Sequence, residues 1–245
     1  MGRIPNEFCD LRSEHRDRIK IHFRIDECTE IVSMAFSKVK LPKKRRIILG
    51  AGVLPLILAG LWARRALPER LNAIPASGGE SFSMAAIPTP HYLQKDPRWK
   101  NDSIGGSGEK LARVGCTVCS LSMALGHYGV GATPGELNDF LKQNDGYTLR
   151  GWLKWNTVSN FTSGKVVMEY IGRPRFSRID ATLKTGHPVV VKVLINGIIP
   201  HWVLIVGKDD AEYLMRDPLD EAKNVKPLSE YGSKIYAIRT LRARH

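Results

Sequence analysis

Cys116 lies where a polypeptide can stabilise a reactive thiolate. It follows Gly115 and opens an apolar run that predicts a helix from about Cys116 to Tyr128. The first N–H groups of a helix have no partner inside it, and the positive end of the helix dipole lies there. Both features lower the pKa of a thiol, so Cys116 is a candidate nucleophile.

A nucleophilic cysteine also needs a base and a group that orients this base. His201 opens the apolar run 201–206, which predicts a buried strand, and Asp217 ends the next predicted strand. If these strands are antiparallel neighbours, Asp217 can accept a ring N–H of His201 and select its tautomer. The amide of Gln94, far upstream, is a candidate donor to an oxyanion, beside the backbone N–H of Cys116.

Other interpretations of these residues remain open. Cys119 completes a Cys-x-x-Cys pair with Cys116, which is typical of thiol–disulfide proteins, although a glycine-rich loop precedes it here instead of a strand. Asp209 and Asp210 read as a hairpin turn, but either one is a second candidate for orienting His201. No second pair of metal ligands has zinc-site spacing, so we expect no metal and no organic cofactor.

Several stretches together resemble a known enzyme family. They are Tyr92–Trp99 with its Gln-x-Asp-x-Arg-Trp pattern, the glycine loop 105–108, Gly115-Cys116 with Ser120, Leu121 and Met123, His201-Trp202-Val203, and Asp217-Pro218. Together they are similar to papain-like cysteine peptidases of the thirty-ninth family. The similarity is to its stand-alone branch of double-glycine (bacteriocin-processing) peptidase-like proteins, and it covers residues 90–240.

The resemblance implies an α+β papain-like fold, with a cysteine-bearing helix packed on an antiparallel sheet that bears the histidine and aspartate. It implies that Cys116 is the nucleophile, His201 the general base and acid, Asp217 the orienting residue and Gln94 the oxyanion-hole side chain. The expected activity is thiol-dependent cleavage of amide bonds in a peptide or protein. No ATP-binding cassette is attached, so cleavage coupled to export is not expected. An inactive papain-like module that binds peptide or cell-wall material is the alternative.

The predicted elements place helices first and strands later, which is the α+β pattern. Thr133-Pro134 predicts a capped helix to about Asn144, and Ser177 is expected to cap a shorter helix that ends at Gly186. A short helical stretch near 150–156 would place Trp152 and Trp155 in the core. The expected strands are 166–171, 188–194, 201–206, 212–216 and 235–239.

The first third of the chain has a different character. The net charge is +13, and residues 1–75 hold 15 basic and 8 acidic residues. We expect residues 1–46 to form a basic tail, with a possible translation start at Met34. Residues 47–63 carry no charge and predict a membrane anchor or signal segment, and the proline- and glycine-rich residues 64–90 predict a linker.

This organisation predicts a peptidase domain at 91–245 that faces the periplasm or the exterior. Basic residues are denser before the apolar run than after it, which favours an N-terminus that stays inside. Because the densest basic cluster flanks this run, we attribute it to membrane insertion and expect no nucleic-acid partner. If the segment is cleaved, the domain is secreted.

Overall fold

The central sheet of the computed structural model is antiparallel throughout, in the order β2-β8-β3-β4-β5-β6. The structure describes residues 69–232 and 234–244. The strands of this sheet are β2 (Val166–Gly172), β3 (Val189–Ile195), β4 (Ile199–Asp209), β5 (Glu212–Arg216), β6 (Val225–Pro227) and β8 (Ala237–Ala243). A smaller sheet pairs β1 (Ile74–Pro75) with β7 (Lys234–Ile235).

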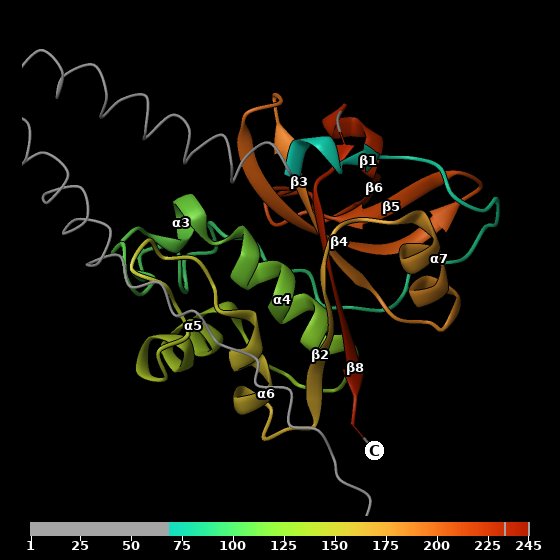
Figure 1. Cartoon of the computed structure of the whole chain (residues 1–245). Coiled ribbons are helices and arrows are strands. Elements are labelled where there is room, and N and C mark those ends of the chain that lie inside the picture. The colour runs from blue at the N-terminus through green and yellow to red at the C-terminus, as the bar shows by residue number, and fades with distance from the viewer. Residues whose placement is uncertain (1–68, 233, 245) are drawn as a thin grey trace, which may run out of the picture. The chain divides into compact units, whose positions relative to one another are not determined.

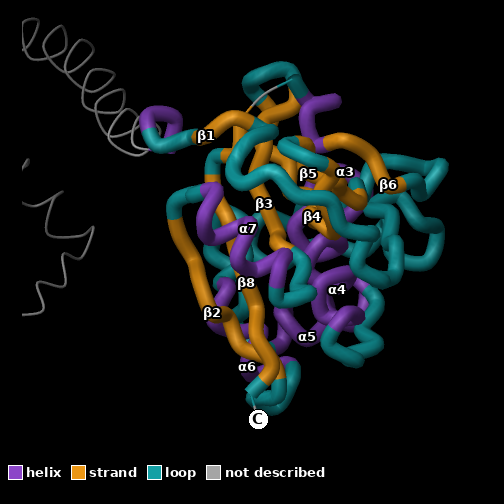
Figure 2. Tube along the Cα trace, turned by 90° about the vertical axis from the view of Figure 1, so that its right-hand side faces the viewer, coloured by secondary structure: helices purple, strands orange, loops and turns teal. Residues whose placement is uncertain are grey.

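Helices lie on both sides of the central sheet. Helices α4, α5 and α6 lie on one side and α7 on the other, as Figures 1 and 2 show from two directions. The bounds are α3 (Leu111–Val114), α4 (Cys116–His127), α5 (Pro134–Gln143), α6 (Val158–Phe161) and α7 (Phe176–Lys184), with 3₁₀ turns η1 (Trp155–Thr157) and η2 (Leu228–Tyr231). The predicted α+β fold is confirmed.

Helix α4 is the buried helix of the domain. Its sequence, CTVCSLSMALGH, has apolar or small side chains on every face, and all residues from Val118 to Leu125 are buried. A helix that is apolar all round is buried rather than amphipathic. Gly115 lets the backbone pass close to the carbonyl oxygen of Leu111, because a Cβ at this position would lie only 2.5 Å from that oxygen. The predicted helix is therefore confirmed, and Cys116 is its first residue.

Strand β4 runs through the middle of the sheet between β3 and β5. In the hairpin with β3, His201 lies opposite Val193, and the apolar stretch 203–206 is completely buried. This burial explains why β3 and β4 read as continuous apolar runs rather than as alternating ones. The predicted turn at Asp209 and Asp210 is also confirmed, because β4 ends at Asp209 and Asp210 has a φ of 54°.

Of the two helices predicted to have a side-chain cap, only α5 has one. Helix α5 has the predicted cap: the Thr133 hydroxyl accepts from the N–H of Glu136, whose carboxylate accepts from the N–H of Thr133. The prediction that Ser177 caps α7 was wrong. The chain is extended at Arg175, which is the N-cap residue, so the helix starts at Phe176 without a side-chain cap.

The tryptophans after α5 do not form the expected core stripe. Helical structure begins only at Trp155, so Trp152 lies in the preceding loop with 61% of its surface exposed. Trp155 is partly buried and packs on Trp202 of β4, with ring centroids 5.0 Å apart. The guanidinium of Arg239 lies 4.9 Å from the centre of the Trp155 ring. The spacing of three was therefore misleading, because no helix spans both residues.

Residues 74–87, here called the strap, lie in the region where the sequence predicts a linker, but they are paired with other strands. Beyond Ile205, where the β3–β4 pairing ends, the strap takes the place of β3 beside β4. The N–H of Met84 donates to the Lys208 carbonyl, and the N–H of Ile87 donates to the Val206 carbonyl. The strap thus pairs with the end of β4 that β3 leaves free, although its composition resembles that of a linker.

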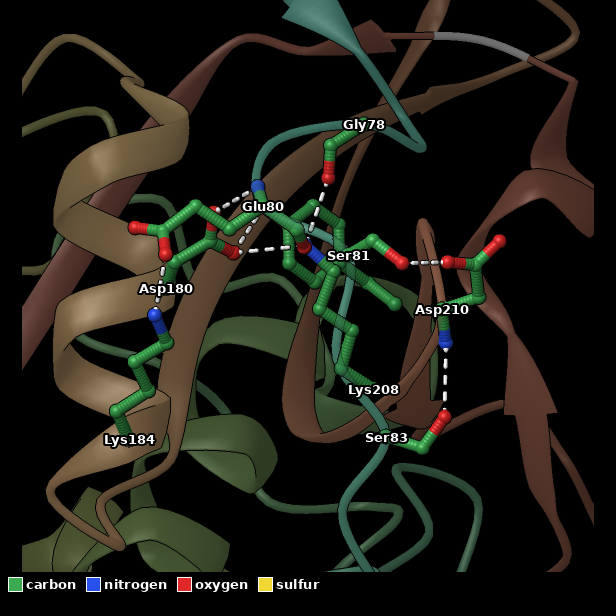
Figure 3. Close-up of polar contacts among 9 residues, drawn as sticks. Gly78, Glu80, Ser81, Ser83, Asp180, Lys184, Lys208 and Asp210 are labelled. Atoms are coloured by element: carbon green, nitrogen blue, oxygen red, sulfur yellow. Dashed lines mark hydrogen bonds and ion pairs between the residues drawn. The ribbon is translucent and has the colours of Figure 1, made fainter.

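A buried ionic cluster fixes the strap (Figure 3). The ammonium of Lys208, with no exposed surface, donates to the carbonyls of Gly78 and Glu80 and to Oδ1 of Asp180, at 2.6–2.9 Å. Asp180, also fully buried, accepts in turn from the Glu80 N–H and the Tyr213 hydroxyl, at 2.8 Å each. At Gly79, where φ is +80°, a Cβ would lie 2.3 Å from Asp180 Oδ2.

The predicted anchor 47–63 and the basic tail 1–46 lie outside the described residues, so these assignments stay predictions. Within residues 69–244, no helix combines the length and the apolar character needed to cross a bilayer.

Candidate active site

Cys116, His201 and Asp217 come together at the junction of α4 and β4. Nε2 of His201 lies 2.7 Å from Oδ1 of Asp217, and the imidazole lies close enough to the Cys116 thiol for each group to shift the pKa of the other. Since Nε2 faces the carboxylate, Nδ1 is the ring nitrogen left for the sulfur. The three groups thus form a row of sulfur, imidazole and carboxylate, with His201 between Cys116 and Asp217.

The backbone of Trp202 fixes the distance between the helix and the strand. Its carbonyl accepts from the hydroxyl of Ser120 at 3.0 Å, and its N–H lowers the pKa of the Cys116 thiol. Ser120 is fully buried and lies one helical turn after Cys116. The Ser120 bond therefore joins α4 to β4 one turn after Cys116, which keeps Cys116 beside His201.

The three side chains are buried, and their charges support one another. Burial raises the pKa of the Cys116 thiol, but the hydrogen bond and positive charge of His201 outweigh this effect and lower it. Burial disfavours the imidazolium of His201, yet its bonds to Asp217 and Cys116 raise its pKa to about 9. Together these shifts favour a thiolate–imidazolium pair at neutral pH.

The carboxylate of Asp217 has donors on both oxygens. Oδ1 accepts from the backbone N–H of Leu219 at 2.8 Å as well as from His201, and Oδ2 accepts from the hydroxyl of Tyr231. Burial raises the pKa of this carboxyl, but these donors and the charge of His201 lower it overall. Asp217 is therefore held as a carboxylate of fixed orientation.

Gln94 lies against the segment that leads into Cys116. Its Nε2 donates to the carbonyl of Ala112, one turn before Cys116, at 2.9 Å, and its backbone N–H donates to the Pro218 carbonyl at 3.0 Å. The side chain is 5% exposed, and its Oε1 has no hydrogen-bond partner among the described residues. The amide nitrogen carries a second N–H for another acceptor.

The residues after Gln94 explain the pattern Gln-x-Asp-x-Arg-Trp. Trp99 is 2% exposed, and its indole N–H donates to the Leu93 carbonyl at 2.8 Å. Asp96 accepts from the guanidinium of Arg98, which lowers the pKa of the carboxyl. The segment is a tight turn anchored by a buried ring, and this turn positions Gln94.

Other candidates from the sequence take structural roles. Cys119 is completely buried, and burial raises the pKa of its thiol well above the ordinary value. Asp209 and Asp210 bind Ser83 and Ser81 of the strap, so neither orients His201. These contacts leave Asp217 as the carboxylate at the histidine.

The model of the Peptidase_C39 like family matches residues 87–238. The chain belongs to this family. The matched range includes Gln94, Cys116, His201 and Asp217, as well as α4 and β4. The match confirms the predicted relationship to C39-like, papain-like cysteine peptidases.

A solved structure is similar to this C39-like chain. The crystal structure of a chain from Bacillus anthracis, described as a C39-like peptidase, is 19% identical to it, with a TM-score of 0.41. That similarity covers 67% of this chain and 100% of the other. No curated protein matches the sequence.

Two residues of the C39-like site were not found from the sequence. His91 is partly buried, and its Nε2 lies 2.8 Å from the Asp217 carbonyl oxygen. Tyr231, which contacts Oδ2 of Asp217, lies in a 3₁₀ turn that no pattern predicts. Their positions depend on long-range packing, and neither has a local signal in the sequence.

Proposed function

We propose that this C39-like protein hydrolyses amide bonds in peptides or proteins, with Cys116 as nucleophile, His201 as general base and acid, and Asp217 as orienting residue. The observation that carries the proposal is the position of the His201 ring between the Cys116 thiol and Oδ1 of Asp217. This is the arrangement that an activated nucleophile requires: a base in contact with it and a third group that holds the base.

In the acylation step, the Cys116 thiolate attacks the carbonyl carbon of the scissile amide. The carbonyl electrons move to oxygen, and the second N–H of the Gln94 amide, together with the backbone N–H of Cys116, donates to this oxyanion. The imidazolium of His201 then gives its Nδ1 proton to the leaving amine. The carbon–nitrogen bond breaks, and a thioester at Cys116 remains.

In the deacylation step, neutral His201 takes a proton from water, and the hydroxide formed attacks the thioester. The carbon–sulfur bond breaks, which releases a carboxylic acid and restores the thiolate–imidazolium pair. Throughout the cycle Asp217 keeps the proton on Nε2, so that Nδ1 faces the sulfur and the substrate. Every proton transfer in both steps uses a group of this site, or water.

The proposal is tested by incubating the full-length chain with a complex mixture of peptides and sequencing the new N-termini by mass spectrometry. We expect cleavage by the wild type and none by His201→Ala. A wild type that is folded and reduced but creates no new termini would favour the inactive binding module. A wild type that creates no new termini and forms a reducible disulfide between Cys116 and Cys119 would favour a thiol–disulfide protein.

A separate prediction concerns the oxyanion. Gln94→Ala is expected to lower kcat by about 10²–10³-fold with little change in KM, because the amide acts on charge that develops only in the transition state. Steady-state kinetics on one peptide substrate measure both constants. Gln143→Ala, at the end of α5, is the control and should leave kcat unchanged. A large rise in KM at constant kcat would assign Gln94 to substrate binding instead.

A further inference from the structure

Tyr231 contacts the site from an element that lies far from Cys116 and Gln94 in the sequence. It ends the 3₁₀ turn η2, whose first residue, Leu228, is completely buried and anchors the turn. The Tyr231 hydroxyl donates to Oδ2 of Asp217, and its ring lies edge-on to the His201 imidazole with centroids 5.6 Å apart. One side chain thus contacts both the orienting carboxylate and the base.

The two oxygens of Asp217 differ in how they are held. Oδ1 has two donors, His201 and the Leu219 N–H, whereas Tyr231 is the donor to Oδ2. A carboxylate fixed at one oxygen alone can rotate about its Cα–Cβ and Cβ–Cγ bonds. The Tyr231 hydroxyl therefore sets the plane of the carboxylate, and with it the direction of the His201 ring.

The hydroxyl is suited to be a permanent donor. Burial and the bond to Asp217 both raise the pKa of Tyr231 above its ordinary value, so the phenol keeps its proton throughout the physiological range. A hydrogen bond to a charged acceptor is worth about twice as much as one between neutral groups. Loss of this hydroxyl would leave one oxygen of a buried carboxylate without its donor.

We propose that Tyr231 is a positioning residue of the site: its hydroxyl holds Oδ2 of Asp217 so that Oδ1 keeps His201 aligned with Cys116. The inference rests on the proposed function of these three residues. It predicts that the contribution of Tyr231 passes through the Asp217 carboxylate and disappears when this carboxylate is absent.

The test is a double-mutant cycle in the full-length chain. Tyr231→Phe is expected to lower kcat on a peptide amide by about tenfold, with KM unchanged, because it removes one hydrogen bond to a charged group. In an Asp217→Asn background the same change should lower kcat less than twofold. Each rate is divided by the folded fraction, measured by thermal unfolding, so that a loss of stability does not count as a loss of catalysis.

Tyr170→Phe is the matched control. Its hydroxyl donates to the Arg173 carbonyl near the end of β2, and its removal should leave kcat unchanged in both backgrounds. Equal losses for Tyr231→Phe in the two backgrounds, or a loss below twofold in the wild type, would overturn the proposal. Absence of cleavage and of a reactive thiol in the wild type would instead overturn the proposed function, which distinguishes the two failures.

Discussion

Cys116→Ala is expected to abolish both peptide cleavage and rapid labelling by a thiol-directed, peptide-like electrophile. His201 lowers the pKa of the Cys116 thiol, and Cys116 keeps 8% of its surface exposed whereas Cys119 keeps none. Removing a nucleophile typically costs more than about 10³-fold in kcat. Labelling followed by peptide mapping, with kcat measured in parallel, gives both readouts and distinguishes Cys116 from Cys9, Cys28 and Cys119.

Cys119→Ala is the matched control for this substitution. It lies on the same helix and is also buried, but the thiol is completely inaccessible and its pKa is raised, so it has no means of activation. We expect labelling and kcat within about twofold of the wild type, together with a modest loss of stability from the smaller side chain. Retained labelling in Cys116→Ala and lost labelling in Cys119→Ala would contradict the assignment.

Lys208→Met is expected to destabilise the domain by about 3–5 kcal/mol, the range found when one partner of a buried ion pair is removed. The change leaves the fully buried carboxylate of Asp180 without its cation, and the carbonyls of Gly78 and Glu80 without their donor. Urea unfolding of the full-length chain measures the effect as a lower midpoint at unchanged slope.

Lys184→Met provides the comparison (Figure 3). Its ammonium pairs with the carboxylate of Glu80, and both side chains are largely exposed to water. Such a pair contributes less than about 1 kcal/mol, so the unfolding midpoint should barely change. If both substitutions cost the same small amount, the buried cluster does not hold the strap as described.

The core of the site could be predicted because its signals are local. A glycine followed by a cysteine and an apolar run predicts α4, and a histidine that opens an apolar run predicts the start of β4. Adjacent strands in a hairpin then bring His201 and Asp217 together, as antiparallel pairing requires. The local sequence patterns were therefore sufficient to predict that His201 lies next to Asp217.

The strap could not be predicted, because its residue types are those of a flexible linker, whereas in the fold it pairs with β4. Its proline, glycine and serine residues have the character of a linker, and nothing local signals that β4 has a free edge beyond Ile205. The charge of Lys208 likewise indicates a surface residue, since a buried lysine requires acceptors that are far away in the sequence. Here those acceptors come from residues 78–80 and from α7.

The rate of Cys116 alkylation by iodoacetamide as a function of pH, in the wild type and in His201→Ala, measures whether His201 activates the thiol. We expect rapid alkylation of the wild type well below the ordinary thiol pKa of about 8.5, because His201 holds Cys116 as a thiolate. In His201→Ala the rate should rise only near or above that value. A wild-type rate that rises only near pH 8.5, with the same profile in His201→Ala, would show that His201 does not activate Cys116.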